Sequence, residues 1–371
     1  MRSWLRVGWA LSVALPAVIL VGELTCALLF RAERRSADEF RRLTPNIFQG
    51  QGFMEAGHKS LWEKFAWEYR PGARLAKDVM GLRYEVEINS HGFRTHEFAA
   101  RKPRGTVRVI CVGGSTTVQG LTNEQTYPAL LEARLRKARP SCPVEVLNFG
   151  ISGTDSGRWL AESDKLFSYE PDLVVQYDAV NDIMRDALPR YVREHPYRNL
   201  VQKSLFLSWI APLDPRELDP ALEGIVEKEE ALARLCRLHD SDHLAGFFAS
   251  PDYERAGREQ RAFLDVNLAE GWTTWQGIRL TRYRDYARIL RRYNTLLEEA
   301  ALRGRLRAAR VDQAVTDPGL YVDLCHMTEP GIARLADAFL PAVLDVVGAR
   351  CLPEASSNRP LKDPGGPSEP R

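Results

Sequence analysis

The sequence predicts an α/β fold with a parallel β-sheet, preceded by an N-terminal transmembrane helix. Three short apolar runs rich in β-branched residues, at 107–112, 144–149 and 172–177, alternate with helical patterns. This alternation implies right-handed crossovers and a sheet that helices cover on both faces. A longer apolar segment near the N-terminus lies outside this pattern and has the length of a membrane span.

The N-terminal segment 7–30 is apolar apart from three residues: Ser12, Glu23 and Thr25. Its 24 residues would span about 36 Å as a helix, enough to cross a hydrocarbon core of roughly 30 Å. A cleaved signal peptide is the alternative, because Arg2 and Arg6 form a basic start and the charge-free stretch 7–22 is short. No small-x-small cleavage motif follows, which favours the anchor.

Helical patterns separate the three predicted strands. The first strand runs into a Gly-Gly-Ser-Thr-Thr turn, and a helix then begins at Thr126, a suitable N-cap, with Pro128 in its first turn. A second helix over residues 154–168 leads to the third strand. Strand, helix, strand, helix and strand thus follow one another, as a parallel sheet requires.

The C-terminal half continues the alternation less regularly. A helix is predicted over 281–303, with Gly304 as its stop, followed by a weak strand at 306–311 and a last helix after Pro330. Residues 190–280 are longer than a simple crossover needs, and their pattern assigns no element.

Composition narrows the function classes. The formal net charge of +2 comes without a long basic run, which argues against nucleic-acid binding. Six cysteines lack the paired spacing of a zinc site, so no metal site is indicated and the disulfide pairing stays open. The tail, 351–371, is rich in Pro, Ser and Gly and is predicted to be disordered.

Polar residues follow each predicted strand, and ligands of an open parallel sheet bind at the carboxyl ends of its strands. Ser115 follows the first strand, Gly153 the second and Asn181 the third. A further motif, Asp323-Leu-Cys-His326, precedes the last helix. We expect these residues to surround one reacting carbonyl group.

These residue types suit acyl transfer. A serine hydroxyl needs a base to take its proton and a third group to orient that base, which predicts Ser115 as nucleophile, His326 as base and Asp323 as its partner. The developing oxyanion needs donors. We expect the backbone N–H groups of Ser115 and Gly153 and the side-chain amide of Asn181 to supply them.

Each motif alone has a simpler interpretation. Ser115 suits a helix N-cap, and Asn181 suits an Asx-turn. Asp323 and His326 suit a surface pair at the start of a helix. Their order along the chain, with each motif at a strand end or before the last helix, favours one catalytic site.

The motifs Gly-Gly-Ser115-Thr-Thr, Asn148-Phe-Gly-Ile-Ser-Gly153, Ala-Val-Asn181-Asp182 and Asp323-x-x-His326 resemble the four blocks of SGNH (GDSL-like) hydrolases. The resemblance implies a flavodoxin-like three-layer α/β/α fold and an esterase, lipase, thioesterase, carbohydrate acetylesterase or O-acetyltransferase activity, without a metal or organic cofactor. Two departures stand out: Gly114 replaces the aspartate of Gly-Asp-Ser, and Ala179 replaces a frequent glycine.

The resemblance covers about residues 106–350, where it implies a hydrolase domain. The sequence pattern adds an anchor over 1–35, an extension of unclear role over 36–105 and the tail. Residues 88–97 of the extension weakly resemble bacterial members with N-terminal anchors. From this resemblance we expect the catalytic domain on the extracytoplasmic, periplasmic side of the membrane.

The leading hypothesis is a serine esterase that acts on an acyl group of a glycan, a lipid or a small molecule. One alternative is an O-acyltransferase for cell-envelope polysaccharide. The other is a non-catalytic envelope protein that binds glycan in the same pocket.

Overall fold

The computed structural model describes residues 2–44, 68–79, 81–269, 280 and 282–351. Its centre is a five-stranded sheet in the order β4-β3-β5-β6-β7, and all neighbouring strands are parallel. The strands are β3 (Val107–Gly113), β4 (Val144–Asn148), β5 (Leu173–Tyr177), β6 (Asp242–Gly246) and β7 (Ala308–Ala309). In chain order this is the flavodoxin-like arrangement 2-1-3-4-5. The predicted α/β class is confirmed.

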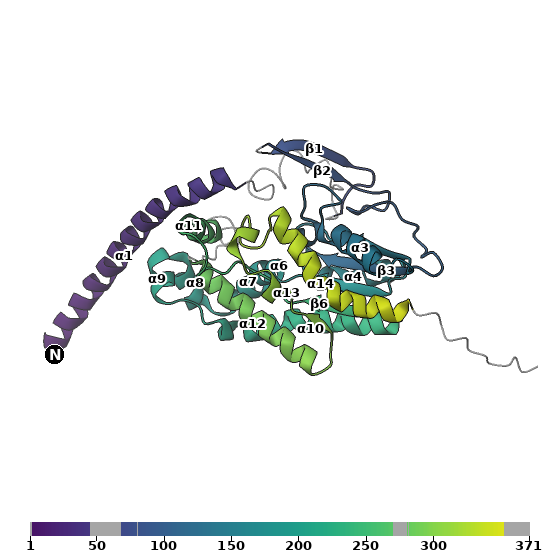
Figure 1. Cartoon of the computed structure of the whole chain (residues 1–371). Helices are drawn as coiled ribbons and strands as arrows, with labels where there is room; N and C mark the ends of the chain where they lie inside the picture. Colours follow the sequence, from purple (N-terminus) through teal and green to yellow (C-terminus); the bar gives the residue numbers. More distant parts are fainter. Residues whose placement is uncertain (1, 45–67, 80, 270–279, 281, 352–371) are drawn as a thin grey trace, which may run out of the picture.

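Helices cover both faces of this sheet (Figure 1). On one face, Val109 of β3 packs in a cluster with Leu131 of α3 (Tyr127–Ala138) and Leu335 of α14 (Glu329–Arg350). On the other face, Ile110 clusters with residues of α4 (Gly157–Ala161), α5 (Ser163–Phe167) and α10 (Asp219–Leu238). Because β3 alternates between two apolar layers, all seven of its residues are buried.

The single helix predicted over 154–168 is wrong in detail, because the structure has two short helices there. α4 ends and α5 begins around Glu162, whose φ of −105° and ψ of 30° leave the helical range. Trp159 and Leu166 lie seven residues apart and face the same apolar layer, so the sequence pattern is that of one helix. The spacing of apolar residues does not reveal that the helix is interrupted at a single residue.

The last two strands of the sheet also differ from the prediction. The weak strand predicted at 306–311 is only two residues long, as β7. The unassigned region 190–280 contains β6, which pairs with β5 and extends the sheet. β6 begins with Asp242 and His243, and polar residues at the start of a strand hide it from a search for apolar runs.

The remaining elements lie mainly after β5 and after β6. After β5 come α6 (Val180–Asp182), the π-helical turn η2 (Ile183–Ala187), α7 (Leu188–Glu194), α8 (Pro196–Lys203), α9 (Leu205–Ile210) and the 3₁₀ turn η3 (Pro215–Leu218). After β6 come α11 (Arg258–Asn267), α12 (Tyr283–Leu302), α13 (Val311–Ala314) and the 3₁₀ turn η6 (Pro318–Leu320). The short helix α2 (Ser115–Val118) follows β3.

The N-terminal segment forms one long helix, α1 (Arg2–Leu43), which lies along one end of the domain in Figure 1. Within the described residues, one helix is long and apolar enough to cross a membrane, with its span inside Ala14–Leu43. The C-terminal part of α1 contacts α11, where Phe40 stacks on Phe263 with ring centroids 4.8 Å apart. This contact joins α1 to the domain.

The extension and the cysteines complete the fold. β1 (Arg74–Val79) and β2 (Leu82–Glu87) form an antiparallel hairpin. A disulfide joins Cys142 to Cys351, whose Cα atoms are 5.8 Å apart. The tail predicted to be disordered lies outside the described residues from 352 onward, and the predicted domain boundaries stay predictions.

Candidate active site

Ser115 lies at the carboxyl end of β3, where the chain turns directly into α2. This turn requires glycine at position 113. Gly113 has a φ of +155°, and a Cβ there would lie 2.3 Å from Thr117 Oγ1 and 2.5 Å from the carbonyl oxygen of Tyr177. The strand that follows β3 in the chain, β4, lies on one side of it, and all later strands lie on its other side. The site at the end of β3 is therefore at the topological switch point of the sheet.

A line of hydrogen bonds joins the three residues predicted to form a triad. Nε2 of His326 lies 2.8 Å from Oγ of Ser115, and Nδ1 of His326 lies 2.7 Å from Oδ2 of Asp323. The loop before α14 therefore crosses the carboxyl end of β3, although 211 positions separate Ser115 from His326. The geometry suits an imidazole that accepts a proton from serine while its other nitrogen donates to a carboxylate.

The Asp323 carboxylate is buried and held in its charged form. Burial alone would raise its pKa, but the neighbouring His326 and several hydrogen bonds outweigh this effect and lower the pKa. Its Oδ1 accepts from the backbone N–H groups of Cys325 (2.9 Å) and His326 (2.7 Å). The short loop thus fixes the carboxylate beside the imidazole.

The two further predicted residues also reach this region. Gly153 has a φ of +82°, which favours glycine, and its carbonyl accepts a hydrogen bond from Arg185. The side-chain amide of Asn181 donates to the carbonyl of Thr154 at 2.7 Å. A Cβ at Gly114 would lie 2.9 Å from this amide nitrogen, so Asn181 stands directly over the residue before Ser115. An amide nitrogen carries two hydrogens, and one of them is committed to Thr154.

Asp178 is a site residue that the sequence did not single out. Its Oδ1 accepts the backbone N–H of Gly114 at 3.0 Å. Burial, together with the carboxylates of Asp182, Glu229 and Asp155, raises its pKa well above the ordinary value. These contacts explain why glycine stands at position 114 in place of the aspartate of Gly-Asp-Ser, because Asn181 and Asp178 occupy the space beside it.

The extension of unclear role supports the loop of the nucleophile. Arg94 is buried and donates hydrogen bonds to the carbonyls of Val118 (2.5 Å), the last residue of α2, and Gly120 (3.0 Å), just after it. Phe93 stacks on Phe149 at the end of β4, with ring centroids 3.7 Å apart. The motif Asn-Ser-His-Gly-Phe-Arg was visible in the sequence, but only the fold shows what it touches.

Asp323, Cys325 and His326 each place a potential metal-ligating atom within 4.8 Å of the others. Burial and the Asp323 carboxylate hold the pKa of the Cys325 thiol well above its ordinary value. Within this group, Nδ1 of His326 and Oδ2 of Asp323 are hydrogen-bonded to each other.

Residues 111–334, more than half of the chain, match the model of the GDSL-like lipase/acylhydrolase family. A search of curated proteins found no match. Several solved structures resemble the chain at low sequence identity and low TM-score.

Three of these structures illustrate the range. An α/β hydrolase enzyme from the metagenome of Lake Arreo, Spain, is 20% identical, with a TM-score of 0.41 and coverage of 67% of this chain and 96% of that chain. A carbohydrate acetylesterase family member from Sinorhizobium meliloti is 14% identical, with a TM-score of 0.41 and coverage of 65% and 99%. A variant of an acetyl xylan esterase from Geobacillus stearothermophilus is 16% identical, with a TM-score of 0.39 and coverage of 65% and 94%.

Proposed function

The chain belongs to the GDSL-like lipase/acylhydrolase family, and from this membership we propose that it cleaves a carboxylic ester through an acyl-enzyme on Ser115. Membership in this family identifies the chain as a serine hydrolase that acts on ester bonds. The observation that carries the residue assignment is the hydrogen-bonded line from Ser115 through His326 to Asp323.

In the first half of the reaction, Ser115 Oγ attacks the ester carbonyl carbon while His326 Nε2 takes the hydroxyl proton. Asp323 holds the imidazole in one tautomer and stabilises the imidazolium. His326 then gives the proton to the oxygen of the leaving alcohol, and the C–O bond of the substrate breaks. In the second half, His326 activates water, and the acyl group leaves as the acid.

The tetrahedral intermediates carry a negative oxygen that needs fixed donors. The backbone N–H groups of Ser115 and Gly153 and the second amide hydrogen of Asn181 take this role. Asn181 is nine-tenths buried, and its hydrogen bond to Thr154 holds the amide in place. Removing one such donor typically costs about 3 kcal/mol of transition-state stabilisation.

The substrate that we propose is an acyl ester of a glycan or lipid in the cell envelope. Two observations support an extracytoplasmic domain anchored by α1. The Cys142–Cys351 disulfide fits an oxidising compartment. The apolar segment of α1 itself contacts the domain, because the Glu23 carboxylate accepts hydrogen bonds from Ser204 and Leu205, which favours a retained anchor over a cleaved signal peptide.

The test is hydrolysis of p-nitrophenyl acetate, butyrate and octanoate by the full-length protein in detergent, since α1 is packed against the domain. Ser115→Ala and His326→Ala should abolish turnover, and the preference for chain length should define the acyl group. Covalent labelling of Ser115 by a fluorophosphonate checks the nucleophile independently. Labelling without hydrolysis, but with acetyl transfer to an added glycan, would identify an acyltransferase, and absence of both would overturn the proposal.

A further inference from the structure

Glu23 is a charged residue inside the apolar segment of α1, and it is bound to a distant part of the chain. Its carboxylate accepts hydrogen bonds from Ser204 Oγ (2.7 Å) and from the backbone N–H groups of Leu205 and Phe206 (3.0 Å each). These groups form the first turn of α9. A charged side chain at the centre of a membrane helix is strongly unfavourable, so it needs such partners.

A second contact fixes α9 at the same level of α1. A Cβ on Gly22 would lie 2.5 Å from the Phe206 ring, so this ring packs directly on the backbone of α1. Close approach at a small residue is the usual way in which helices pack within membranes. α9 is therefore seated on α1 at Gly22 and Glu23.

The position of this contact along α1 sets its depth. Gly22 precedes Phe30, the end of the apolar segment, by eight residues, which is about 12 Å at helical rise. If the membrane surface lay at Gly22, only the 15 residues of 7–21 would remain within it. They would span about 22 Å, less than the roughly 30 Å of a hydrocarbon core. The surface therefore lies beyond Gly22, towards Phe30.

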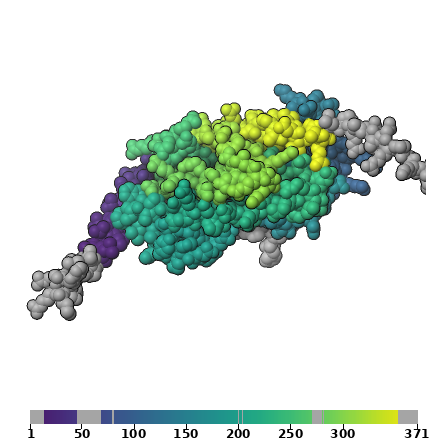
Figure 2. Space-filling model, turned by 90° about the horizontal axis from the view of Figure 1, so that it is seen from below, coloured from purple at the N-terminus to yellow at the C-terminus, as the bar shows by residue number. Residues whose placement is uncertain are grey.

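Large apolar side chains are exposed on α8 and α9. Four large side chains there are more than half exposed: Tyr197 (59%), Leu200 (69%), Trp209 (52%) and Ile210 (52%). Among the described residues after α1, only Leu82, Leu238 and Leu302 are also large, apolar and exposed. Figure 2 shows α1, in purple, beside the teal surface that contains this region.

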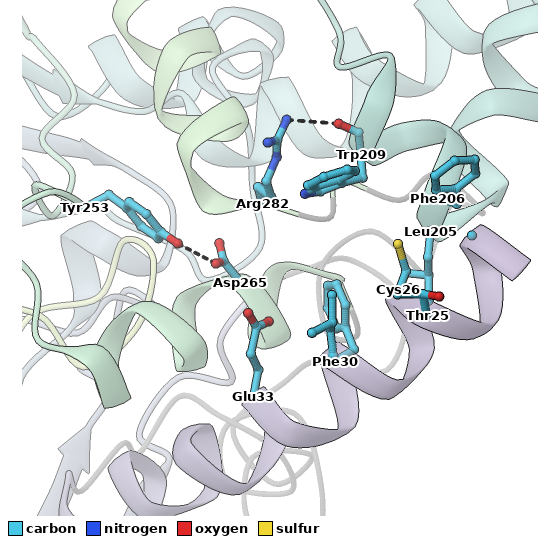
Figure 3. Close-up of a pocket in the computed structure, with 12 residues that line it drawn as sticks. Thr25, Cys26, Phe30, Glu33, Leu205, Phe206, Trp209, Tyr253, Asp265 and Arg282 are labelled. Atoms are coloured by element: carbon cyan, nitrogen blue, oxygen red, sulfur yellow. Dashed lines mark hydrogen bonds between the residues drawn. The ribbon is translucent and has the colours of Figure 1, made fainter.

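The pocket between α1, α9 and α11 changes character along its length (Figure 3). Its volume is about 400 Å³, and its wall near Gly22 is built by Leu205 and Phe206. Further along α1 the wall becomes polar, with Glu33, Asp265 and Arg282. This change from apolar to charged lining follows the change that a bilayer makes between its acyl chains and its headgroups.

We propose that α8 and α9 insert into the surface of the same bilayer that holds α1, so that the domain is seated on lipid by a second contact. The partner is the lipid itself. Leu200 and Ile210 would contact acyl chains, and Trp209 would lie at the headgroup level that tryptophan prefers. The proposal rests on α1 as an anchor and is independent of the esterase activity.

The test uses the full-length protein in phosphatidylcholine nanodiscs, with a nitroxide spin label at Leu200→Cys. Leu302→Cys is the matched control, because it is also an exposed leucine on a helix, at 82% exposure. It lies at the end of the 20-residue helix α12, about 30 Å along the axis from Arg282. The described free cysteines are buried, and protein without an added cysteine measures their background.

We expect the label at position 200 to collide more often with oxygen, which concentrates in lipid, than with a water-soluble nickel complex. The label at position 302 should show the reverse. Equal exposure of both labels to nickel would place α8 in water and overturn the proposal. Shielding of position 200 from both reagents would mean that protein covers it, which also overturns it. Ile210→Cys repeats the measurement if Leu200→Cys does not fold.

Discussion

The phenolic oxygen of Tyr69 accepts a hydrogen bond from the backbone N–H of Ser152, 3.1 Å away. Tyr69 belongs to the extension, whereas Ser152 precedes Gly153 in the loop after β4. Together with Arg94, which binds the carbonyls of Val118 and Gly120, this contact joins the extension to both loops that we propose to hold the oxyanion. We therefore expect substitutions in the extension to change catalysis.

Tyr69→Phe should lower kcat about tenfold with little change in KM. The Ser152 N–H is buried, and losing its acceptor costs about 1–3 kcal/mol. The loop that carries Gly153 would shift to relieve part of this cost, and the shift would raise the activation free energy. Ester hydrolysis measures kcat and KM, and urea unfolding measures the loss of stability. Tyr197→Phe is the control, because Tyr197 is exposed on α8. A Tyr69→Phe enzyme with unchanged kcat would show that the loop holds its shape without the tyrosine.

Asp323→Asn should lower kcat by about four orders of magnitude, because the neutral amide no longer holds the His326 tautomer or stabilises imidazolium. The measurement is steady-state hydrolysis of p-nitrophenyl acetate. Asp345→Asn, at an exposed position of α14, should leave kcat unchanged. A loss of less than tenfold would assign Asp323 a structural role only.

Asn181→Asp should lower kcat by about 10² to 10³ with KM nearly unchanged, because a carboxylate of the same shape cannot donate to the oxyanion. Steady-state kinetics on the acetate ester separates kcat from KM. A rise in KM at constant kcat would instead make Asn181 a substrate-binding residue.

Gly114→Ala should lower both stability and kcat. The added Cβ would lie 2.9 Å from the Asn181 amide nitrogen and 3.0 Å from the Thr154 carbonyl oxygen, so the oxyanion loops would have to shift. Gly224→Ala is the matched control. Its Cβ would meet nothing closer than 3.7 Å, and alanine stabilises a helix interior by up to about 1 kcal/mol over glycine. Equal behaviour of the two variants would contradict this account.

The free energy of unfolding should fall as the pH rises from about 5 to about 9. Burial raises the pKa of Glu229 from 4.5 to about 8, and burial raises that of Asp182 to about 6. Through these two groups, the folded state binds more protons than the unfolded state in this window. The stability that these groups contribute is complete below their unfolded pKa values and is lost as the pH passes their folded values.

Glu229→Gln should reduce this dependence above about pH 6, because it removes one of the buried carboxyl groups that still titrate there. Glu227→Gln, at an exposed position of the same helix, should keep the slope of the parent protein. Urea unfolding across the pH range measures both. A Glu229→Gln protein with the parent slope would assign the dependence to other groups.

Much of the fold follows from local pattern. β3, β4 and β5 were predicted because they are apolar on both faces, and the strand-end rule predicted which loops meet. β6 was missed because Nε2 of His243 is buried 3.0 Å from the Gln176 side chain, and a polar pair inside a sheet leaves no apolar run. The contact between Glu23 and Phe206 spans 183 positions, and no local pattern encodes it.

α1 continues as a helix from Arg31 to Leu43, past the apolar segment. These 13 residues extend for about 20 Å, and Phe40 and Ala37 fix them to α11. With α1 in a bilayer, this rigid connection would fix the domain relative to the membrane. Ser115 would then keep a constant height above the bilayer and a constant orientation. Encounters then depend on the substrate. A lipid must drift to the enzyme within the plane of the membrane, and a polymer must pass at the height of the serine.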